Sequence, residues 1–340
     1  MKKKILLIAA AIVAIALAIL GVAAFSIFGP NTKNTKEVQI TVPRDATYAQ
    51  VKDTLRAHDL LQNGKTFDAV VKAMKFKTMR CGHYTISPKM SNFDLVRLLR
   101  AGQHYPVKFA FNNARTIDQF VSKVGHHFFF EPEELRALLS DSTVMAKYGF
   151  NAATIPAMFI PNSYEFYYDI SAEGFLDKMY SIYQNFWNEK RKAKAQEIGL
   201  SPIEVATLAS IVEEENFRSD EKPIIAGLYI NRLHKGMLLQ ADPTVKFAIG
   251  DFARKRILNS DLQIDSPYNT YKYPGLPPGP IRIPDGSTLD AVLNYTHHDY
   301  LFMCAKEDFS GYHNFTASAG QHAQNAARYR AALNKRNIKH

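Results

Sequence analysis

The stretch SPIEVATLASIVEEEN, residues 201–216, decides the fold that we expect for the larger part of this chain. Ser201 and Glu204 have the spacing of a capping box, and Pro202 occupies the first helical position, so a helix start is well marked. At about 100° per residue, the apolar side chains form one buried stripe: Val205, Leu208, Ala209 and Val212. The helix therefore ends in three consecutive glutamates, whose phase relative to this stripe sets their surroundings.

The phase of the helix separates Glu213, Glu214 and Glu215. Glu214 is expected to point into solvent, whereas the other two flank the stripe. Small residues lie beside Glu213 and bulkier apolar ones beside Glu215, so Glu213 is expected in a roomy, partly desolvated niche. A carboxyl group in such a niche has a raised pKa and suits proton transfer. The alternative is a solvated acidic helix end, and spacing alone leaves both interpretations open.

The N-terminal part of the chain reads as a membrane anchor. Three lysines at residues 2–4 precede an uncharged stretch, residues 5–28, that is long enough to cross a bilayer as a helix. A cleaved signal peptide is the alternative. The lysines favour a cytoplasmic N-terminus. We therefore expect a cytoplasmic tail (1–4), a transmembrane helix (5–28) and a linker (29–37) in a single-pass bacterial inner-membrane protein whose bulk is periplasmic.

The net charge of the sequence indicates which kinds of binding partner to expect. The formal net charge is +10, and the part beyond the anchor remains basic, which suits an anionic polymer or a membrane surface. No concentrated Lys/Arg run or nucleic-acid motif is present, which argues against nucleic acid as a partner.

The two cysteines of the sequence, Cys81 and Cys304, are expected to be free thiols rather than a disulfide bridge. No Cys/His spacing indicates a metal site, and no cofactor is expected.

The remaining pattern predicts an α+β protein with two units after the anchor. A strand at 38–42, helical patterns, a strand at 81–86 and a helix at 91–99 form a small unit, residues 38–104. A larger unit, residues 105–340, begins with a strand at 107–111. Within it, residues 172–194 read as one long amphipathic helix.

Several segments together resemble a known family. In chain order they are LASIVEEE (208–215), NRL (231–233), LQADPTV (239–245), YNTY (268–271), GLPPGPI (275–281) and HNF (313–315). This ordered set is similar to the MltG/YceG-like endolytic murein transglycosylases. The chain departs from the family pattern at Asn162-Ser163 and at Gln321-His322, and no chemistry is assigned to either position.

The resemblance implies a peptidoglycan lytic transglycosylase, a lyase of cell wall biogenesis with a LysM-like subdomain (38–104) and a YceG-like catalytic domain (105–340). Such enzymes cut nascent glycan strands between N-acetylmuramic acid (MurNAc) and N-acetylglucosamine (GlcNAc), leaving 1,6-anhydroMurNAc ends. The family's catalytic glutamate is the first acid after LASIV, which is Glu213 in this sequence. It would protonate the leaving oxygen and then take the proton of the muramic C6 hydroxyl, so that no second carboxyl is needed.

Polar and aromatic groups in the loop motifs are of the kind that holds sugars. We expect substrate binding by five residues: Gln240, Asp242, Asn269, Tyr271 and Asn314. Asp242 has two alternatives, a cap of the turn formed with Pro243 or a second carboxylate that activates water. The latter belongs to a hydrolytic muramidase, and a non-enzymatic glycan-binding scaffold for cell-wall synthases is a third function. The resemblance also suggests penicillin-binding proteins as partners. The LysM-like unit would bind glycan or act as a spacer.

Overall fold

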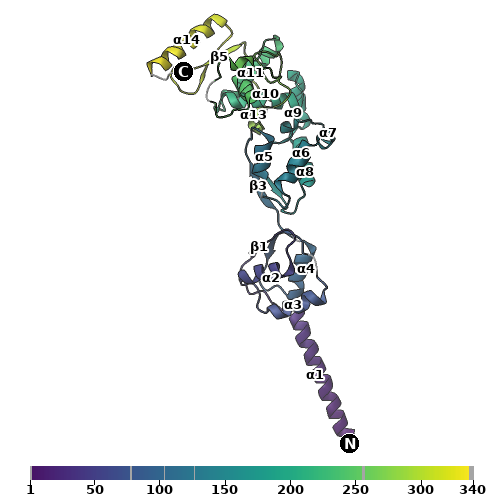
Figure 1. Cartoon of the computed structure of the whole chain (residues 1–340). Coiled ribbons are helices and arrows are strands. Elements are labelled where there is room, and N and C mark those ends of the chain that lie inside the picture. Colours follow the sequence, from purple (N-terminus) through teal and green to yellow (C-terminus); the bar gives the residue numbers. More distant parts are fainter. Residues whose placement is uncertain (1, 77–78, 103, 126, 255–256, 337–340) are drawn as a thin grey trace. The chain divides into compact units, whose positions relative to one another are not determined.

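The fold is α+β, as the sequence predicts (Figure 1). It is seen in a computed structural model that describes residues 2–76, 79–102, 104–125, 127–254 and 257–336. The chain divides into two compact units: a first made of residues 1–109, 126–130 and 164–171, and a second made of residues 110–125, 131–163 and 172–340. The boundary expected after residue 104 stays a prediction.

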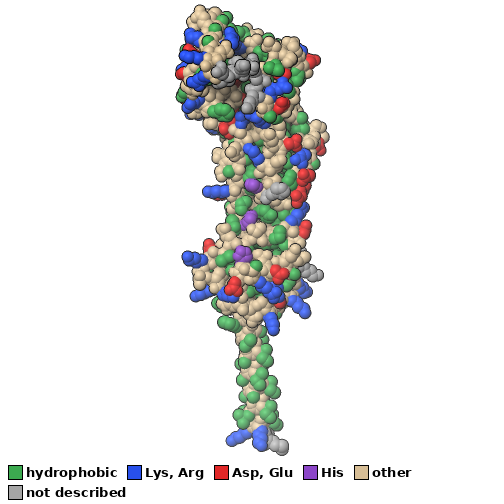
Figure 2. All heavy atoms as spheres, turned by 60° about the vertical axis from the view of Figure 1, so that its left-hand side comes forward, with side chains coloured by type: hydrophobic (Ala, Val, Ile, Leu, Met, Phe, Trp, Pro, Cys, Tyr) green, Lys and Arg blue, Asp and Glu red, His purple; other side chains and the backbone are tan. Residues whose placement is uncertain are grey.

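Helix α1 carries the apolar N-terminal stretch. It runs from Lys2 to Phe28, and the side chains of its residues 3–25 are exposed. Figure 2 shows hydrophobic side chains covering the visible face of this helix. Among the described residues, one helix, Lys3–Phe28, is long and apolar enough to cross a membrane. A helix with apolar side chains all round is stable in lipid rather than in water, which agrees with the predicted anchor.

The rest of the first unit is a small core covered by short helices. Its elements are β1 (Val38–Val42), α2 (Tyr48–Ala57), α3 (Gly64–Ala73), β2 (Gly82–Ile86), α4 (Asn92–Ala101) and the start of β3 (Val107–Phe111). Strands β1 and β2 pair antiparallel, with Val38 opposite Ile86. Each helix begins at a polar side chain that accepts a backbone N–H: Thr47, Asn63 and Ser91. Mostly aliphatic and aromatic side chains from β1, α2, α3, β2 and α4 form one buried cluster.

The second unit is mostly helical. Its elements are α5 (Ile117–Val124), α6 (Pro132–Ser140), α7 (Ser142–Lys147), η1 (Ile155–Met158), the start of β4 (Asn162–Phe166), α8 (Ala172–Phe186), α9 (Glu189–Ile198), α10 (Pro202–Glu215), α11 (Lys222–His234), α12 (Asp242–Ile249), η2 (Asp261–Gln263), α13 (Gly286–Leu293), β5 (Phe302–Ala305), β6 (His313–Thr316) and α14 (Ala319–Lys335). Strand β3 pairs with β4, and β5 pairs antiparallel with β6. The hairpin β5–β6 packs against α14.

The expectation of one long helix over residues 172–194 is wrong. Helix α8 ends at Phe186, and a separate helix, α9, begins at Glu189. Asn188 explains the break, because its side chain accepts the backbone N–H of Arg191 at 3.0 Å and so caps a new helix. The two cysteines, Cys81 and Cys304, are free thiols.

Helix α10 lies at the centre of the second unit. It packs against α9, α11, α12 and α13. The predicted capping box is confirmed, since Ser201 and Glu204 each accept the other's backbone N–H. The predicted single stripe is wrong, however, because every residue from Val205 to Glu213 is buried. A helix covered on all sides has no wet face, so the phase of an apolar stripe cannot rank its glutamates.

Candidate active site

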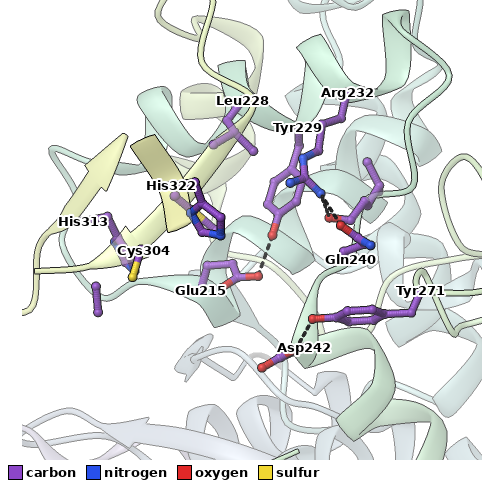
Figure 3. A pocket seen from close by; sticks show the side chains of 13 residues that line it. Glu215, Leu228, Tyr229, Arg232, Gln240, Asp242, Tyr271, Cys304, His313 and His322 are labelled. Carbon is purple, nitrogen blue, oxygen red and sulfur yellow. Dashed lines mark hydrogen bonds between the residues drawn. The ribbon is translucent and has the colours of Figure 1, made fainter. Parts of the chain in front are cut away.

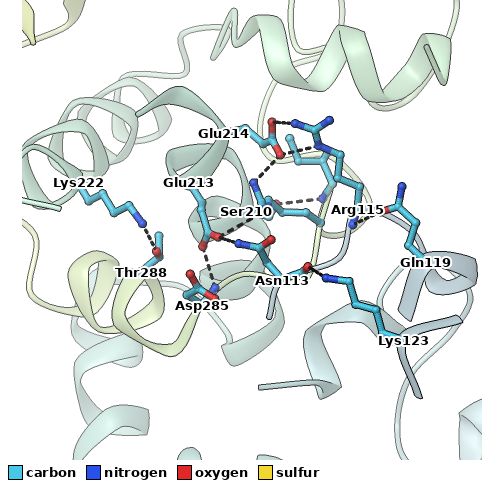
Figure 4. Close-up of polar contacts among 12 residues, drawn as sticks. Asn113, Arg115, Gln119, Lys123, Ser210, Glu213, Glu214, Lys222, Asp285 and Thr288 are labelled. Atoms are coloured by element: carbon cyan, nitrogen blue, oxygen red, sulfur yellow. Dashed lines mark hydrogen bonds and ion pairs between the residues drawn. The ribbon is translucent and has the colours of Figure 1, made fainter. Parts of the chain in front are cut away.

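Glu213 is tied into the protein interior rather than facing open space. Its side chain is only 5% exposed. One carboxylate oxygen accepts the Asn113 amide at 2.9 Å, and the other accepts the backbone N–H of Asp285 at 2.7 Å (Figure 4). Arg282 Nη2 lies 3.5 Å from the first oxygen. The niche expected beside Glu213 is therefore filled by the protein's own chain.

Glu214 does not point into solvent, contrary to the prediction. Arg115 donates to both of its oxygens at 3.0 Å, and Arg282 Nη1 donates to one of them at 2.6 Å. Arg282 is 7% exposed and bridges two largely buried carboxylates, Glu213 and Glu214. Bidentate, charge-assisted bonds of this kind are strong, so the cluster fixes α10 against two distant segments of the chain.

A cavity of about 290 Å³ opens at the C-terminal end of α10 (Figure 3). It brings together side chains from α10, α11, α12, two loops, β5, β6 and α14. Its lining is Glu215, Leu228, Tyr229, Arg232, Leu239, Gln240, Asp242, Tyr271, Met303, Cys304, Ala305, His313 and His322. Glu215 is the glutamate of α10 that lines this cavity, and Glu213 and Glu214 do not.

The Glu215 carboxyl group is suited to carry a proton near neutral pH. Burial raises its pKa to about 7, and the negative charges of Asp242 and Glu214 act in the same direction. The Tyr229 hydroxyl donates a hydrogen bond to Glu215 Oε1 at 2.6 Å, which together with Arg232 opposes the rise. Burial also raises the pKa of Tyr229 well above its ordinary value, so this hydroxyl remains a donor. A carboxyl that is half protonated at pH 7 can act as an acid or as a base.

This raised pKa predicts a pH-dependent cost to stability. Well below pH 4.5 the carboxyl is protonated in both the folded and unfolded states, so it costs nothing. Between pH 4.5 and about 7 the folded state binds the proton more tightly, so the free energy of unfolding falls as pH rises. We expect Glu215→Gln to remove this cost, which makes the variant more stable than the wild type by about 3 kcal/mol at pH 8.

Urea unfolding of both proteins at pH 4 and pH 8 measures this difference. The comparison between variant and wild type cancels the titration of all other groups. A stability difference that does not change with pH would contradict the raised pKa of Glu215.

Three of the five residues expected to bind substrate lie together with Glu215. Gln240, Asp242 and Tyr271 all line the cavity. The Tyr271 hydroxyl donates to Asp242 Oδ1 at 2.5 Å, and Gln240 Oε1 accepts from Arg232 Nη1 at 3.3 Å. Asp242 is the first residue of α12, and its alternative role as a cap of the turn formed with Pro243 stays a prediction.

The other two do not line the cavity. Asn269 is fully buried, and its amide donates to two backbone carbonyls of its own loop while its oxygen accepts the Tyr271 N–H. It therefore holds the loop that presents Tyr271. Asn314 follows the cavity-lining His313 on β6 and donates to Glu307. Asn314 pairs with Cys304 across the hairpin but is not among the residues that line the cavity.

Several cavity residues were not assigned a role from the sequence. Tyr229 and Arg232 belong to α11, whose other buried residues are nearly all apolar. Two polar side chains within this apolar pattern are the sequence signal from which their role could have been predicted. Arg232 lies over the Phe302 ring, and His322 stacks on the same ring at 5.3 Å. Burial lowers the pKa of His322, with a further contribution from Arg232, and this shift favours the neutral imidazole. Strands β5 and β6 form another side of the cavity, with Met303, Cys304 and Ala305 from β5 and His313 from β6.

The comparisons with known proteins agree with the family that the motifs suggest. A model of the YceG-like family matches residues 40–328. The endolytic murein transglycosylase of Bacillus subtilis (strain 168) is 28% identical over 328 residues, which cover 92% of this chain and 90% of that protein. The endolytic murein transglycosylase of Streptococcus pneumoniae (strain ATCC BAA-255 / R6) is 26% identical over 81% of this chain and 55% of its own length.

A solved structure supports the same assignment. The 2.6 Å crystal structure of a YceG-like protein from Listeria monocytogenes is 25% identical, has a TM-score of 0.56, and covers 86% of this chain and 99% of its own. The family match, the similarity along most of the chain and the shared fold support the same family assignment. This chain therefore belongs to the YceG-like family.

Proposed function

We propose that this protein is a peptidoglycan lytic transglycosylase that cleaves MurNAc–GlcNAc bonds and leaves 1,6-anhydroMurNAc ends. The curated relatives named above are endolytic murein transglycosylases, and one of them is similar along nearly its whole length. A single observation carries the chemistry: a carboxyl group with a pKa of about 7 lines a polar cavity at the end of α10.

We assign the acid role to Glu215, in place of the Glu213 expected from sequence. Protonated Glu215 would donate its proton to the glycosidic oxygen as the C1–O bond breaks and an oxocarbenium-like centre develops. The C6 hydroxyl of the same muramic residue then forms the new bond to C1 and loses its proton, in the simplest scheme to the Glu215 carboxylate. This intramolecular attack is favoured by proximity and consumes no water.

The other cavity residues fit substrate binding. The linked pair Tyr271 and Asp242 and the amide of Gln240 offer donors and acceptors for sugar hydroxyls. Asn269 and Asn314 would act through their neighbours, because neither lines the cavity. Asp242 also supports the second candidate function, a hydrolytic muramidase, since a second carboxylate at the same cavity could activate water.

We further propose the membrane arrangement that the sequence suggests. Helix α1 would anchor the protein in the inner membrane with its lysines in the cytoplasm and the rest of the chain in the periplasm. The small unit would be LysM-like and bind glycan, and penicillin-binding proteins would be partners. These assignments rest on the composition of α1 and on the family resemblance.

The products of cleavage test the proposed function. We expect the full-length protein in detergent to convert glycan strands into fragments that end in 1,6-anhydroMurNAc, as measured by mass spectrometry. Reducing MurNAc ends would instead identify the hydrolytic muramidase. Intact strands after long incubation would support a non-enzymatic scaffold.

A further inference from the structure

A buried glutamate–histidine pair stands next to the candidate active site. Glu221 precedes α11 and is 5% exposed, and His313 is the first residue of β6. His313 Nδ1 lies 2.9 Å from Glu221 Oε2, and the His313 backbone N–H donates to Glu221 Oε1 at 2.9 Å. The Asn216 amide also donates to Glu221 Oε2. Glu221 therefore receives three hydrogen bonds, two of them from one histidine.

These contacts fix which ring nitrogen of His313 carries the proton. An ionised carboxylate has only acceptor oxygens. The Nδ1 atom lies 2.9 Å from Glu221 Oε2 and 3.4 Å from the Asn216 amide, so we assign it as the N–H donor to the nearer Glu221. In the neutral imidazole the other nitrogen, Nε2, is then an acceptor. A carboxylate behind an imidazole also stabilises the imidazolium that forms when Nε2 takes up a proton.

The free nitrogen belongs to a ring that lines the cavity. His313 is part of the cavity wall together with Glu215 (Figure 3). No hydrogen bond joins His313 Nε2 to any of the described residues, and Nε2 is not among the buried atoms left without a partner. The atom is thus accessible, and its position on the ring, away from Glu221, leaves it available to a ligand.

A proton acceptor distinct from the acid would let bond cleavage and attack by the C6 hydroxyl overlap in time. Glu215 has to hold its proton until the glycosidic oxygen leaves, while the attacking hydroxyl must lose one as its bond to C1 forms. One carboxyl group can serve both steps only in sequence. With an imidazole acceptor nitrogen in the same cavity, the two proton transfers no longer have to occur one after the other on a single carboxyl group.

We propose that His313 is a second catalytic residue, the base that accepts the proton of the C6 hydroxyl through Nε2. In this step the C1–O4 bond breaks and O4 takes the Glu215 proton, while the C6 oxygen bonds to C1 and its proton moves to His313. Glu221 stabilises the resulting imidazolium. Proton exchange with solvent then restores both groups, and no water is consumed. This inference rests on the proposed function.

The experiment compares His313→Asn with His313→Gln in the full-length protein. The Asn amide can reproduce the donor to Glu221 but lacks an atom at the Nε2 position, whereas the longer Gln amide reaches that position but cannot accept a proton. We expect both variants to lower kcat by about 100-fold or more with KM within threefold, and the Tm of His313→Asn to stay at the wild-type value. Free imidazole is expected to restore at least tenfold of the lost activity to His313→Ala, but none to Glu215→Gln.

The outcomes separate this inference from the proposed function. A kcat within threefold of wild type in His313→Asn overturns the role of His313, and so does a loss that appears only as a lower Tm or a higher KM. Wild-type protein that forms no anhydro ends overturns the proposed function instead, whatever the histidine variants do.

Discussion

Replacing Glu215 with glutamine is expected to lower the rate of glycan cleavage by about 10³-fold, because the amide has no proton to donate to the leaving oxygen. The fold should survive, since glutamine keeps the shape of the side chain and can still accept the Tyr229 hydroxyl. The measurement is the rate at which anhydroMurNAc ends appear, together with the Tm of the variant.

Glu213→Gln is the matched control, because it makes the same change two residues earlier on the same helix. Its carboxylate bonds to Asn113 and to the Asp285 N–H and does not line the cavity, so activity should stay within a few-fold of wild type. Inactivity of Glu213→Gln alongside a normal rate for Glu215→Gln would return the acid role to Glu213, as the sequence suggested.

Replacing Arg282 with methionine is expected to destabilise the protein by about 3–5 kcal/mol, because it leaves two buried carboxylates without their shared cation. Arg282 lies 3.5 Å from Glu213 and 2.6 Å from Glu214, and its side chain is 8% exposed. Arg115 still pairs with Glu214 in the variant, so Glu213 bears most of the loss. The free energy of unfolding in urea measures the effect.

The control for this change is Arg191→Met. Arg191 makes two bonds to Asp290 at 2.8 and 2.9 Å, but the two side chains are 28% and 42% exposed. Solvent screens such a pair, so its loss should cost about 1 kcal/mol or less. Equal losses in the two variants would show that burial does not determine the strength of the Arg282 cluster.

Local sequence signals predicted much of the fold correctly. The start of α10, the strands β1 and β2 and the N-terminal apolar helix follow from capping residues and periodicity, which act within a few residues. The same kind of signal failed at Asn188, where a cap that lies inside an amphipathic pattern starts a new helix. There a short-range hydrogen bond outweighs the periodicity of the apolar side chains.

The identity of the cavity-facing glutamate could not be predicted from α10 alone. The surroundings of Glu213 are set by Asn113 and Arg282, which lie 100 residues before it and 69 residues after it. The surroundings of Glu215 are set by Tyr229 on the next helix. A helix that is buried on every side takes its polar partners from distant segments, and helical phase carries no information about them.

The loop motifs gave a more reliable guide, because a stiff loop positions polar groups through its own hydrogen bonds. Tyr271 and Asp242 meet as expected for a shared site. Asn269 belongs to the same motif for a different reason, since it holds the backbone of that loop.

The order of the cavity walls along the chain has a consequence for biosynthesis. The hairpin β5–β6 and helix α14 follow residue 301, and they contribute five of the side chains around the cavity: Met303, Cys304, Ala305, His313 and His322. The ribosome therefore makes Glu215 before it makes the opposite wall of the cavity. A chain that stopped before residue 302 would carry Glu215 without that wall, and so without the complete cavity.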